Sequence, residues 1–152
     1  FMSDYIRTIR SKVGHLPIIL NAICGAVVKN QQILLQERTD TKNWSLPGGY
    51  MEYGETFLET LQRELVEDSG LQVKPLALIK TFDQGFTTYP NGDQAQVISR
   101  LYLVKPVGGQ LITSPTDETL SLKYFDFSNL PPLLNQQNQE MITCIAKYLK
   151  IN

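Results

Sequence analysis

Cysteine is scarce in this chain. Only two of its 152 residues are cysteines, Cys24 and Cys144, and both lie in apolar stretches. A chain of this length buries roughly 70% of the surface that its unfolded form exposes, so it needs no disulfide framework to fold. One disulfide between the two stays open on sequence alone, but two buried free thiols in a reducing cytosol are the expectation.

A strong charge of one sign and a long apolar run are also absent. The net charge of −1 argues against a protein that binds nucleic acid or an anionic membrane. No apolar run approaches the roughly 20 residues that cross a bilayer, and no leader of signal-peptide type opens the chain, which favours a cytoplasmic protein. Met2 is the expected native start, so Phe1 is expected to be an added residue.

Histidine occurs once. His15 precedes an apolar stretch, which favours a structural role for it. With this single histidine, the chain has no Ser-His-Asp set and no well-placed Cys-His pair for covalent catalysis. A near-neutral protein can still bind anionic phosphates, but metal ions or a few local arginines must then supply the positive charge.

The alternation of apolar and polar residues predicts one domain over residues 1–152, without repeats or linkers. It predicts helices over 3–12, 55–69 and 135–149, and strands over 18–28, 33–37, 71–82, 94–106 and 120–127. The turn Tyr89-Pro90-Asn91-Gly92-Asp93 predicts a long hairpin between two of these strands. Because strands outnumber helices and the helices lie apart in sequence, the expected class is mixed α/β.

The helix over 55–69 has clear end signals. Thr56 with Glu59 three residues later has the spacing of a capping box, although Glu55 could equally begin the helix. Gly70 is the residue type that commonly follows a helix C-terminus.

This helix carries an unfavourable cluster of acids. Glu64, Glu67 and Asp68 stand at i, i+3 and i+4, on one face of the C-terminal half, where both mutual repulsion and the helix dipole disfavour anions. A bound divalent cation with oxygen ligands, Mg²⁺ above all, would make the arrangement favourable. The alternative is a solvated acidic face that Arg63 partly neutralises.

The residues around the acids decide between a metal site and a solvated acidic face. The chain has Gly49, five residues, Glu55, seven residues, and then Arg63-Glu64-Leu65-x-Glu67-Asp68-x-Gly70-Leu71. This resembles the signature of the Nudix family, G-x5-E-x7-R-E-U-x-E-E-x-G-U with U aliphatic, and differs from it only in Asp68, where the second Glu is usual. The preceding segment, Trp44 to Gly49, is also typical of that family.

The resemblance implies a fold and a set of roles. The implied fold is an α/β/α sandwich with a mixed β-sheet and a catalytic loop–helix–loop. Metal binding is implied for Glu64, Glu67 and Asp68, for the carbonyl of Gly48, and for Glu118 as an extra acid, with an exposed loop glutamate as the alternative for Glu118. Roles in holding the loop and helix together are implied for Gly49, Glu55, Arg63 and Gly70. Asp68 keeps the charge but has a shorter reach.

The implied activity is a Mg²⁺-dependent hydrolase, with Mn²⁺ as a substitute. It would cleave the pyrophosphate bond of a nucleoside diphosphate linked to another moiety, as in a nucleotide sugar, a dinucleoside polyphosphate or a modified nucleotide. Glu67 or Glu64 is the candidate general base. The alternative is a non-catalytic Nudix module that binds a nucleotide as a regulatory ligand. The expected partner is a small-molecule nucleotide, without nucleic acid or membrane, and a homodimer stays open.

Three further residues are candidates for substrate binding. Arg38, at the end of a predicted strand, could hold a phosphate with its planar guanidinium, or it could be an ordinary surface arginine. Trp44 could stack on a base or pack in the core. Tyr89 lies 18 residues after Leu71, near a spacing associated with dinucleoside-polyphosphate members of the family, or it could simply belong to the turn.

Overall fold

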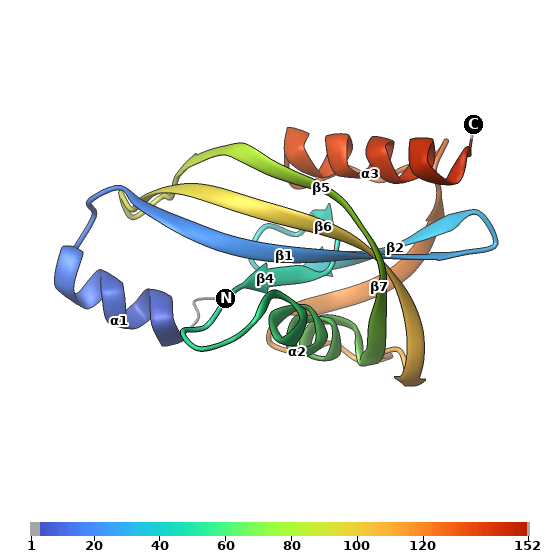
Figure 1. Cartoon of the computed structure of the whole chain (residues 1–152), viewed down its shortest axis with the longest axis horizontal. Helices are drawn as coiled ribbons and strands as arrows, with labels where there is room; N and C mark the ends of the chain where they lie inside the picture. The colour runs from blue at the N-terminus through green and yellow to red at the C-terminus, as the bar shows by residue number, and fades with distance from the viewer. Residues whose placement is uncertain (1–3, 152) are drawn as a thin grey trace.

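A computed structural model describes residues 4–151 and shows a strongly curved sheet between helices (Figure 1). The strands are β1 (Ile18–Lys29), β2 (Gln32–Arg38), β3 (Trp44–Ser45), β4 (Gly48–Tyr50), β5 (Leu71–Thr88), β6 (Gln94–Gly109) and β7 (Thr119–Asp126). The helices are α1 (Asp4–Val13), α2 (Phe57–Ser69) and α3 (Gln136–Leu149). Helix α2 covers one face of the sheet and α3 covers the other, so the α/β/α sandwich is confirmed (Figure 1).

The sheet is mixed. Its main order is β3-β2-β1-β6-β5, with β4 paired to β1 and β7 paired to β2. Strands β1 and β6 run parallel, from Ile18 opposite Ala95 to Val27 opposite Val104, and the other pairs are antiparallel. The long central strand β1 therefore connects the α2 region with the distant turn between β5 and β6.

The two faces of the sheet carry separate cores because successive side chains of a strand point to opposite sides. Ala26 on β1 packs into the core that includes the α3 residues Ile142 and Ile145. The next residue, Val27, packs into the core that includes the α2 residues Leu61 and Leu65. A third, smaller cluster joins Ile6 of α1 to buried residues of β1 and β6, namely Leu20, Ala22, Ala95 and Val97.

The predicted elements all occur, with shifted ends. Helix α2 begins at Phe57 because Thr56 caps it: the Thr56 hydroxyl accepts from the Glu59 backbone at 3.2 Å, and the Glu59 carboxylate accepts from the Thr56 backbone at 3.0 Å. Gly70 ends the helix in the left-handed region, at φ 81°. The capping box and the glycine stop are thus confirmed, and Glu55 lies before the helix.

The hairpin is longer than predicted. Strand β5 continues to Thr88 and β6 to Gly109, where the sequence had indicated ends at Phe82 and Pro106. The register of the pair shifts between Phe82 and Gly85, so the ladder continues past a polar stretch that breaks the apolar alternation. Such an irregularity is invisible to a search for strict period-two patterns.

The remaining expectations concern single residues. Cys24 and Cys144 are free thiols, as expected. His15 packs beside the β5–β6 turn, where its Nδ1 lies 2.7 Å from Asp93 Oδ1. Ser3, the first residue of the predicted N-terminal helix, lies outside the described residues. Between residues 4 and 151, no helix combines the length and apolar character that a membrane crossing requires.

Candidate functional site

The loop before α2 is tied to the helix by one arginine. Arg63 donates from Nε to Glu55 Oε2 at 2.6 Å and from Nη2 to Glu55 Oε1 at 2.9 Å. It also donates to the backbone carbonyl of Tyr50 on β4 at 3.0 Å. The two partners stand eight positions apart, too far for direct pairing along a helix, and they meet because Gly54 turns the chain back at φ 92°. The Arg63 guanidinium holds the pKa of Glu55 down at about 2.

Arg63 also reaches the acidic face of α2. Its Nη1 donates to Glu64 Oε1 at 2.9 Å, whereas its contacts with the Glu67 carboxylate are longer, at 3.4 Å. The Glu64 side chain is 12% exposed and that of Glu67 is 44% exposed. The two glutamates therefore differ: Glu64 is enclosed and paired, and Glu67 faces water.

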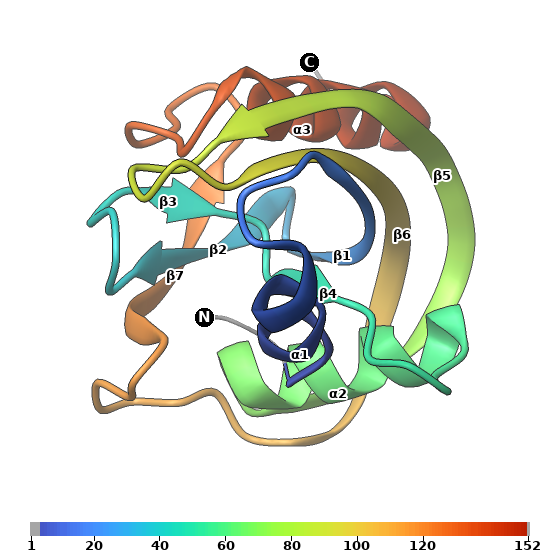
Figure 2. The same cartoon turned by 90° about the vertical axis from the view of Figure 1, so that its left-hand side faces the viewer.

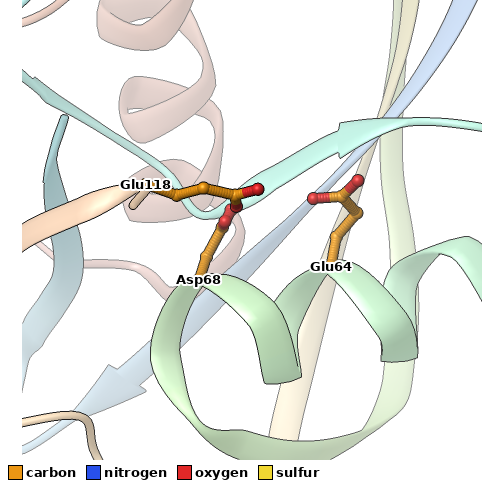
Figure 3. Close-up of side chains that lie close together, drawn as sticks. All are labelled: Glu64, Asp68 and Glu118. Carbon is orange, nitrogen blue, oxygen red and sulfur yellow. The ribbon is translucent and has the colours of Figure 1, made fainter. Parts of the chain in front are cut away.

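Three carboxylates from two distant segments meet above α2 (Figure 3). Glu64, Asp68 and Glu118 each present an oxygen, and these atoms all lie within 4.8 Å of one another. Glu118 comes from the segment that leads into β7. That segment is held against α2 by Thr119, whose hydroxyl donates to the Asp68 carbonyl at 2.8 Å. We refer to Glu64, Asp68 and Glu118 as the acidic trio.

Arg63 neutralises part of the charge of the trio through its contact with Glu64. Burial raises the pKa of Glu64 to about 7, an effect that Arg63 only partly offsets. Burial also raises the pKa of Asp68, and its hydrogen bond with the Glu118 carboxyl and the charge of Glu64 act in the same direction. Without a metal, the Glu64 and Asp68 carboxyls therefore hold protons near neutral pH. A hard divalent cation prefers such oxygen ligands and would displace these protons, so the donor set fits Mg²⁺ or Mn²⁺.

Two glycines of β4 allow the strand to approach the trio closely. The Gly48 amide donates to Asp68 Oδ2 at 2.9 Å. A Cβ placed on Gly49 would lie 2.5 Å from the Glu64 carboxylate. A side chain at position 49 would force the Glu64 carboxylate to shift, so glycine there keeps this carboxylate in its place in the trio.

The acidic face borders a cleft of about 670 Å³, a volume that suits a small organic ligand. Glu64, Glu67, Asp68 and Glu118 line one end, and Gly48, Gly49 and Arg63 line it too. Arg38, at the end of β2, also lines the cleft, and its Nε and Nη2 donate to the Asp40 carboxylate at 2.9 and 2.8 Å. Tyr89 lines the cleft from the β5–β6 turn.

Trp44 is the one candidate that lies elsewhere. It is not among the residues that line the cleft. Its ring packs edge-on against Phe125, with centroids 4.9 Å apart, in the core on the α3 side of the sheet. Of the two roles suggested for Trp44, stacking on a base or packing in the core, packing is the one that matches this position.

Other residues of the cleft carried no sequence signal strong enough to select them. Ile6 of α1, Leu20 of β1 and Tyr50 of β4 line its second end, together with Arg10 and Asp93. Ile6 lies in the helix that the sequence predicts over residues 3–12, and Tyr50 directly follows the two glycines. Which surface each side chain faces depends on how α1 and β4 dock on the sheet, and no local pattern encodes that.

The pKa of Glu64 predicts how stability depends on pH. In metal-free protein between about pH 4.5 and pH 7, folded Glu64 keeps a proton that the unfolded chain releases, so the free energy of unfolding falls as pH rises. Glu64→Gln removes this contribution. The variant should gain stability relative to the unsubstituted protein by about 1–3 kcal/mol from pH 5 to pH 8. Urea unfolding in a chelator at both pH values measures this, and an unchanged difference between the two proteins contradicts it.

Arg63→Ala, compared with Glu64→Gln, should distinguish a residue that stabilises the fold from one that binds the metal. It leaves Glu55 and the Tyr50 carbonyl without their donor, so metal-free protein should lose about 2–4 kcal/mol of stability. Glu64→Gln should cost little or nothing, because the amide is neutral and burial raises the pKa of Glu64 to about 7, which already disfavours its charged form. Thermal melts in a chelator compare the two. Arg7→Ala, which removes an exposed arginine from a weak ion pair with Asp4, is the control and should change stability by less than about 0.5 kcal/mol.

A greater loss from Glu64→Gln than from Arg63→Ala would show that the acidic face is structural. The hydrolytic activity of both variants should also be measured, and both are expected to lose it. Only the order of their effects on stability distinguishes a scaffold residue from a metal-binding one.

Comparison with known sequences identifies relatives. A family model described as a NUDIX domain matches residues 20–145. An ADP-ribose pyrophosphatase of Methanocaldococcus jannaschii is 34% identical over 116 residues, which are 74% of this chain and 64% of that protein. The 8-oxo-dGDP phosphatase NUDT18 of Homo sapiens is 31% identical over 125 residues, 79% of this chain and 36% of that protein. The chain thus spans less than two thirds of either relative.

Comparison with solved structures identifies the same architecture. An ADP-ribose pyrophosphatase from Streptococcus suis matches with a TM-score of 0.72 and 24% identity, over 86% of this chain and 92% of that one. A UDP-X diphosphatase matches with a TM-score of 0.71 and 21% identity, over 95% of this chain and 70% of that one. At these identities the likeness establishes a shared fold.

Proposed function

Because this chain belongs to the NUDIX domain family, whose model matches residues 20–145, we propose that it is a divalent-cation-dependent pyrophosphohydrolase. Its substrate is a nucleoside diphosphate linked to another moiety, and its expected metal is Mg²⁺. The observation that carries the proposal is the acidic trio, which presents three carboxylate oxygens within 4.8 Å of one another at one end of the cleft. A cytoplasmic location is part of the same proposal, because the substrates of this class are intracellular nucleotides.

The trio and its surroundings would hold the metal. Glu64, Asp68 and Glu118 supply the carboxylates, Glu67 lies at the edge of the same face, and the carbonyl of Gly48 is a further candidate ligand. A bound divalent cation supplies charge that offsets the oxyanions of the pyrophosphate and makes a water molecule a better nucleophile. Asp68 has a shorter side chain than glutamate, and the Gly48 amide of β4 donates to its carboxylate at 2.9 Å, which orients that carboxylate.

Glu67 is our candidate for the general base. It lines the cleft, it is 44% exposed, and its contacts with Arg63 are long, so it can receive a proton from water. In the proposed step the water oxygen forms a bond to one phosphorus as the bridging P–O bond breaks. The electrons of that bond stay on the departing phosphate, and the water proton passes to Glu67.

Arg38 is our candidate for a phosphate contact. It lines the cleft from the end of β2, and Asp40 fixes the orientation of its guanidinium. A planar, oriented guanidinium suits a phosphate oxygen better than a flexible ammonium does.

The names of the relatives support the substrate class. ADP-ribose, 8-oxo-dGDP and UDP-X, which these names mention, all contain a nucleoside diphosphate. The shared chemistry is a pyrophosphate bonded to a nucleoside, and we propose the same class for this chain.

A phosphate-release screen tests the proposal. Purified protein is incubated with nucleotide sugars, dinucleoside polyphosphates, ADP-ribose and oxidised nucleotides, with Mg²⁺, with Mn²⁺ and with a chelator. Metal-dependent release from at least one nucleoside diphosphate derivative is expected. Nucleotide binding without turnover of any substrate would instead favour a regulatory binding module.

A further inference from the structure

Strand β2 buries one polar side chain directly after a run of apolar ones. Residues 33–35 are fully buried apolar residues, and Gln36, which follows them, is only 1% exposed. Burial of an amide costs free energy unless hydrogen bonds replace those that water provided. The reason for an amide at position 36 therefore lies in the groups that it contacts.

Gln36 contacts the segment that carries Glu118. Its Nε2 donates to the Thr119 hydroxyl at 2.8 Å and lies 3.5 Å from the backbone carbonyl of Glu118. The Thr119 hydroxyl in turn donates to the Asp68 carbonyl at 2.8 Å. A hydroxyl has one proton and a carbonyl only accepts, so the direction is fixed: Gln36 donates to Thr119, and Thr119 donates to Asp68. We call these two hydrogen bonds the buried bridge.

The buried bridge joins three elements that are distant in sequence. Figure 2 shows β7 beside β2, and the chain that leads into β7 passing along α2. Gln36 belongs to β2, Thr119 begins β7, and Asp68 lies in the last turn of α2. Thr119 and Asp68 are 1% and 2% exposed. Because water does not compete for these groups, the hydrogen bonds of the bridge are stronger than exposed ones.

A β-bulge turns Thr119 toward α2. Glu37 lies opposite Ser121 and Arg38 lies opposite Thr119, so β7 has one extra residue between these pairs. Residues that lie opposite each other on neighbouring strands share a face of the sheet, and Arg38 lines the cleft. Without the extra residue, Thr119 would point to the other face. The bulge therefore gives Gln36 and Asp68 a common partner.

The other contacts of this segment are at the surface. The Thr39 hydroxyl donates to the Asp117 carbonyl at 2.7 Å, and the Thr116 hydroxyl accepts from the Glu118 amide at 3.3 Å, and both bonds are exposed. They shape the turn before β7. The buried bridge connects this turn to the end of α2 where Asp68 lies.

The position of Glu118 follows from this arrangement. Glu118 directly precedes Thr119, and its carboxylate lies within 4.8 Å of those of Glu64 and Asp68 (Figure 3). Neither Gln36 nor Thr119 is among the described residues that line the cleft. Groups that do not touch a metal but orient its ligands commonly change the affinity for that metal. The buried bridge has the location of such a group.

We propose that Gln36 and Thr119 are positioning residues, which together hold Glu118 at the place in the acidic trio that a divalent cation requires. This assignment rests on the proposed function, since it takes the trio to bind the metal. It deepens that function because it makes the affinity for the metal depend on a β2 side chain outside the cleft.

Binding of Mn²⁺ alone tests the assignment without turnover. The paramagnetic resonance signal of free Mn²⁺ gives its affinity for each variant. Thr119→Val keeps the shape of the side chain but removes the hydroxyl, and Gln36→Leu removes the amide donor. Each should weaken Mn²⁺ binding by at least about tenfold. Thr119→Ser keeps the hydroxyl and should retain most of the affinity.

Two control variants on α3 separate positioning from stability. Ile145→Val shortens a fully buried side chain on the other face of the sheet, so it should lower the melting temperature and leave Mn²⁺ affinity unchanged. Thr143→Val removes an exposed hydroxyl that donates to the Gln139 carbonyl, and it should leave Mn²⁺ affinity unchanged.

A double-mutant cycle identifies the residue through which the bridge acts. Glu118→Gln removes the carboxylate that the bridge is proposed to position. In that background Thr119→Val should cause no further loss of Mn²⁺ affinity, because two substitutions that remove one interaction are not additive.

The outcomes separate this assignment from the proposed function. An unchanged Mn²⁺ affinity in Thr119→Val, or an equal loss with and without the Glu118 carboxylate, would overturn the positioning role, even if hydrolysis is normal. If Thr119→Val does not fold, Gln36→Leu is judged by the same criteria. The expected losses of Mn²⁺ affinity without hydrolysis of any nucleotide would support the positioning role and refute the hydrolase. No Mn²⁺ binding by the unsubstituted protein would overturn both.

Discussion

Chelation of divalent cations is expected to reduce hydrolysis by this protein to the background rate, and added Mg²⁺ should restore it. The reason is the charge of the active end of the cleft. Three carboxyls lie within 4.8 Å of one another there, and a pyrophosphate would add further negative charge. Without a cation this approach is repulsive, and burial raises the pKa of Glu64 and of Asp68, so these two carboxyls hold protons instead. Phosphate release with EDTA and after Mg²⁺ addition measures the effect.

A thermal melt provides an independent readout of the same metal site. Mg²⁺ should raise the melting temperature, because a ligand of the folded state stabilises it by mass action. Asp68→Asn should largely abolish the rise, whereas Glu140→Gln on the exposed face of α3 should leave it intact. Full turnover in excess chelator, with no residual metal detected, would refute the assignment.

Glu67→Gln is expected to lower kcat by at least about 10²-fold, which is the contribution of a positioned general base. The amide keeps the shape of the side chain but accepts no proton. The fold should persist, because the Glu67 side chain is 44% exposed and contacts Arg63 only at 3.4 Å. Steady-state kinetics at saturating Mg²⁺ separates loss of the base from weaker metal binding.

The control for this variant is Glu140→Gln, which should have normal kinetics. If Glu67→Gln turns over at a near-normal rate, the base lies elsewhere and Glu118 is the next residue to test. Glu118 also belongs to the acidic trio. For Glu118→Gln and the unsubstituted protein, both kcat and the Mg²⁺ concentration that gives half-maximal activity must therefore be measured.

Short-range interactions explain why many structural features of this protein could be predicted from its sequence. The capping box at Thr56 and the stop at Gly70 depend on residues within three positions of the helix ends, so their spacing alone predicted α2 closely. The turn at Tyr89 to Asp93 likewise predicted the hairpin. The pairing of Glu55 with Arg63 required only that Gly54 turn the chain back, which its lack of a Cβ permits. The acids of α2 share a face because of helical periodicity.

Long-range packing decided the rest. Glu118 joins Glu64 and Asp68 because β7 pairs with β2 in a particular register and Thr119 bonds the end of α2, and neither follows from residues near Glu118. The same packing leaves Glu67 at the edge of the trio and turns Trp44 into the core on the far side of the sheet. It also brings α1 against the β5–β6 turn, where Arg10 meets the carbonyl of Gln94, 84 positions later. The sequence by itself determined the helix that carries the acids. Only the tertiary structure decided which other residues face them, because sheet register and helix docking depend on the whole core.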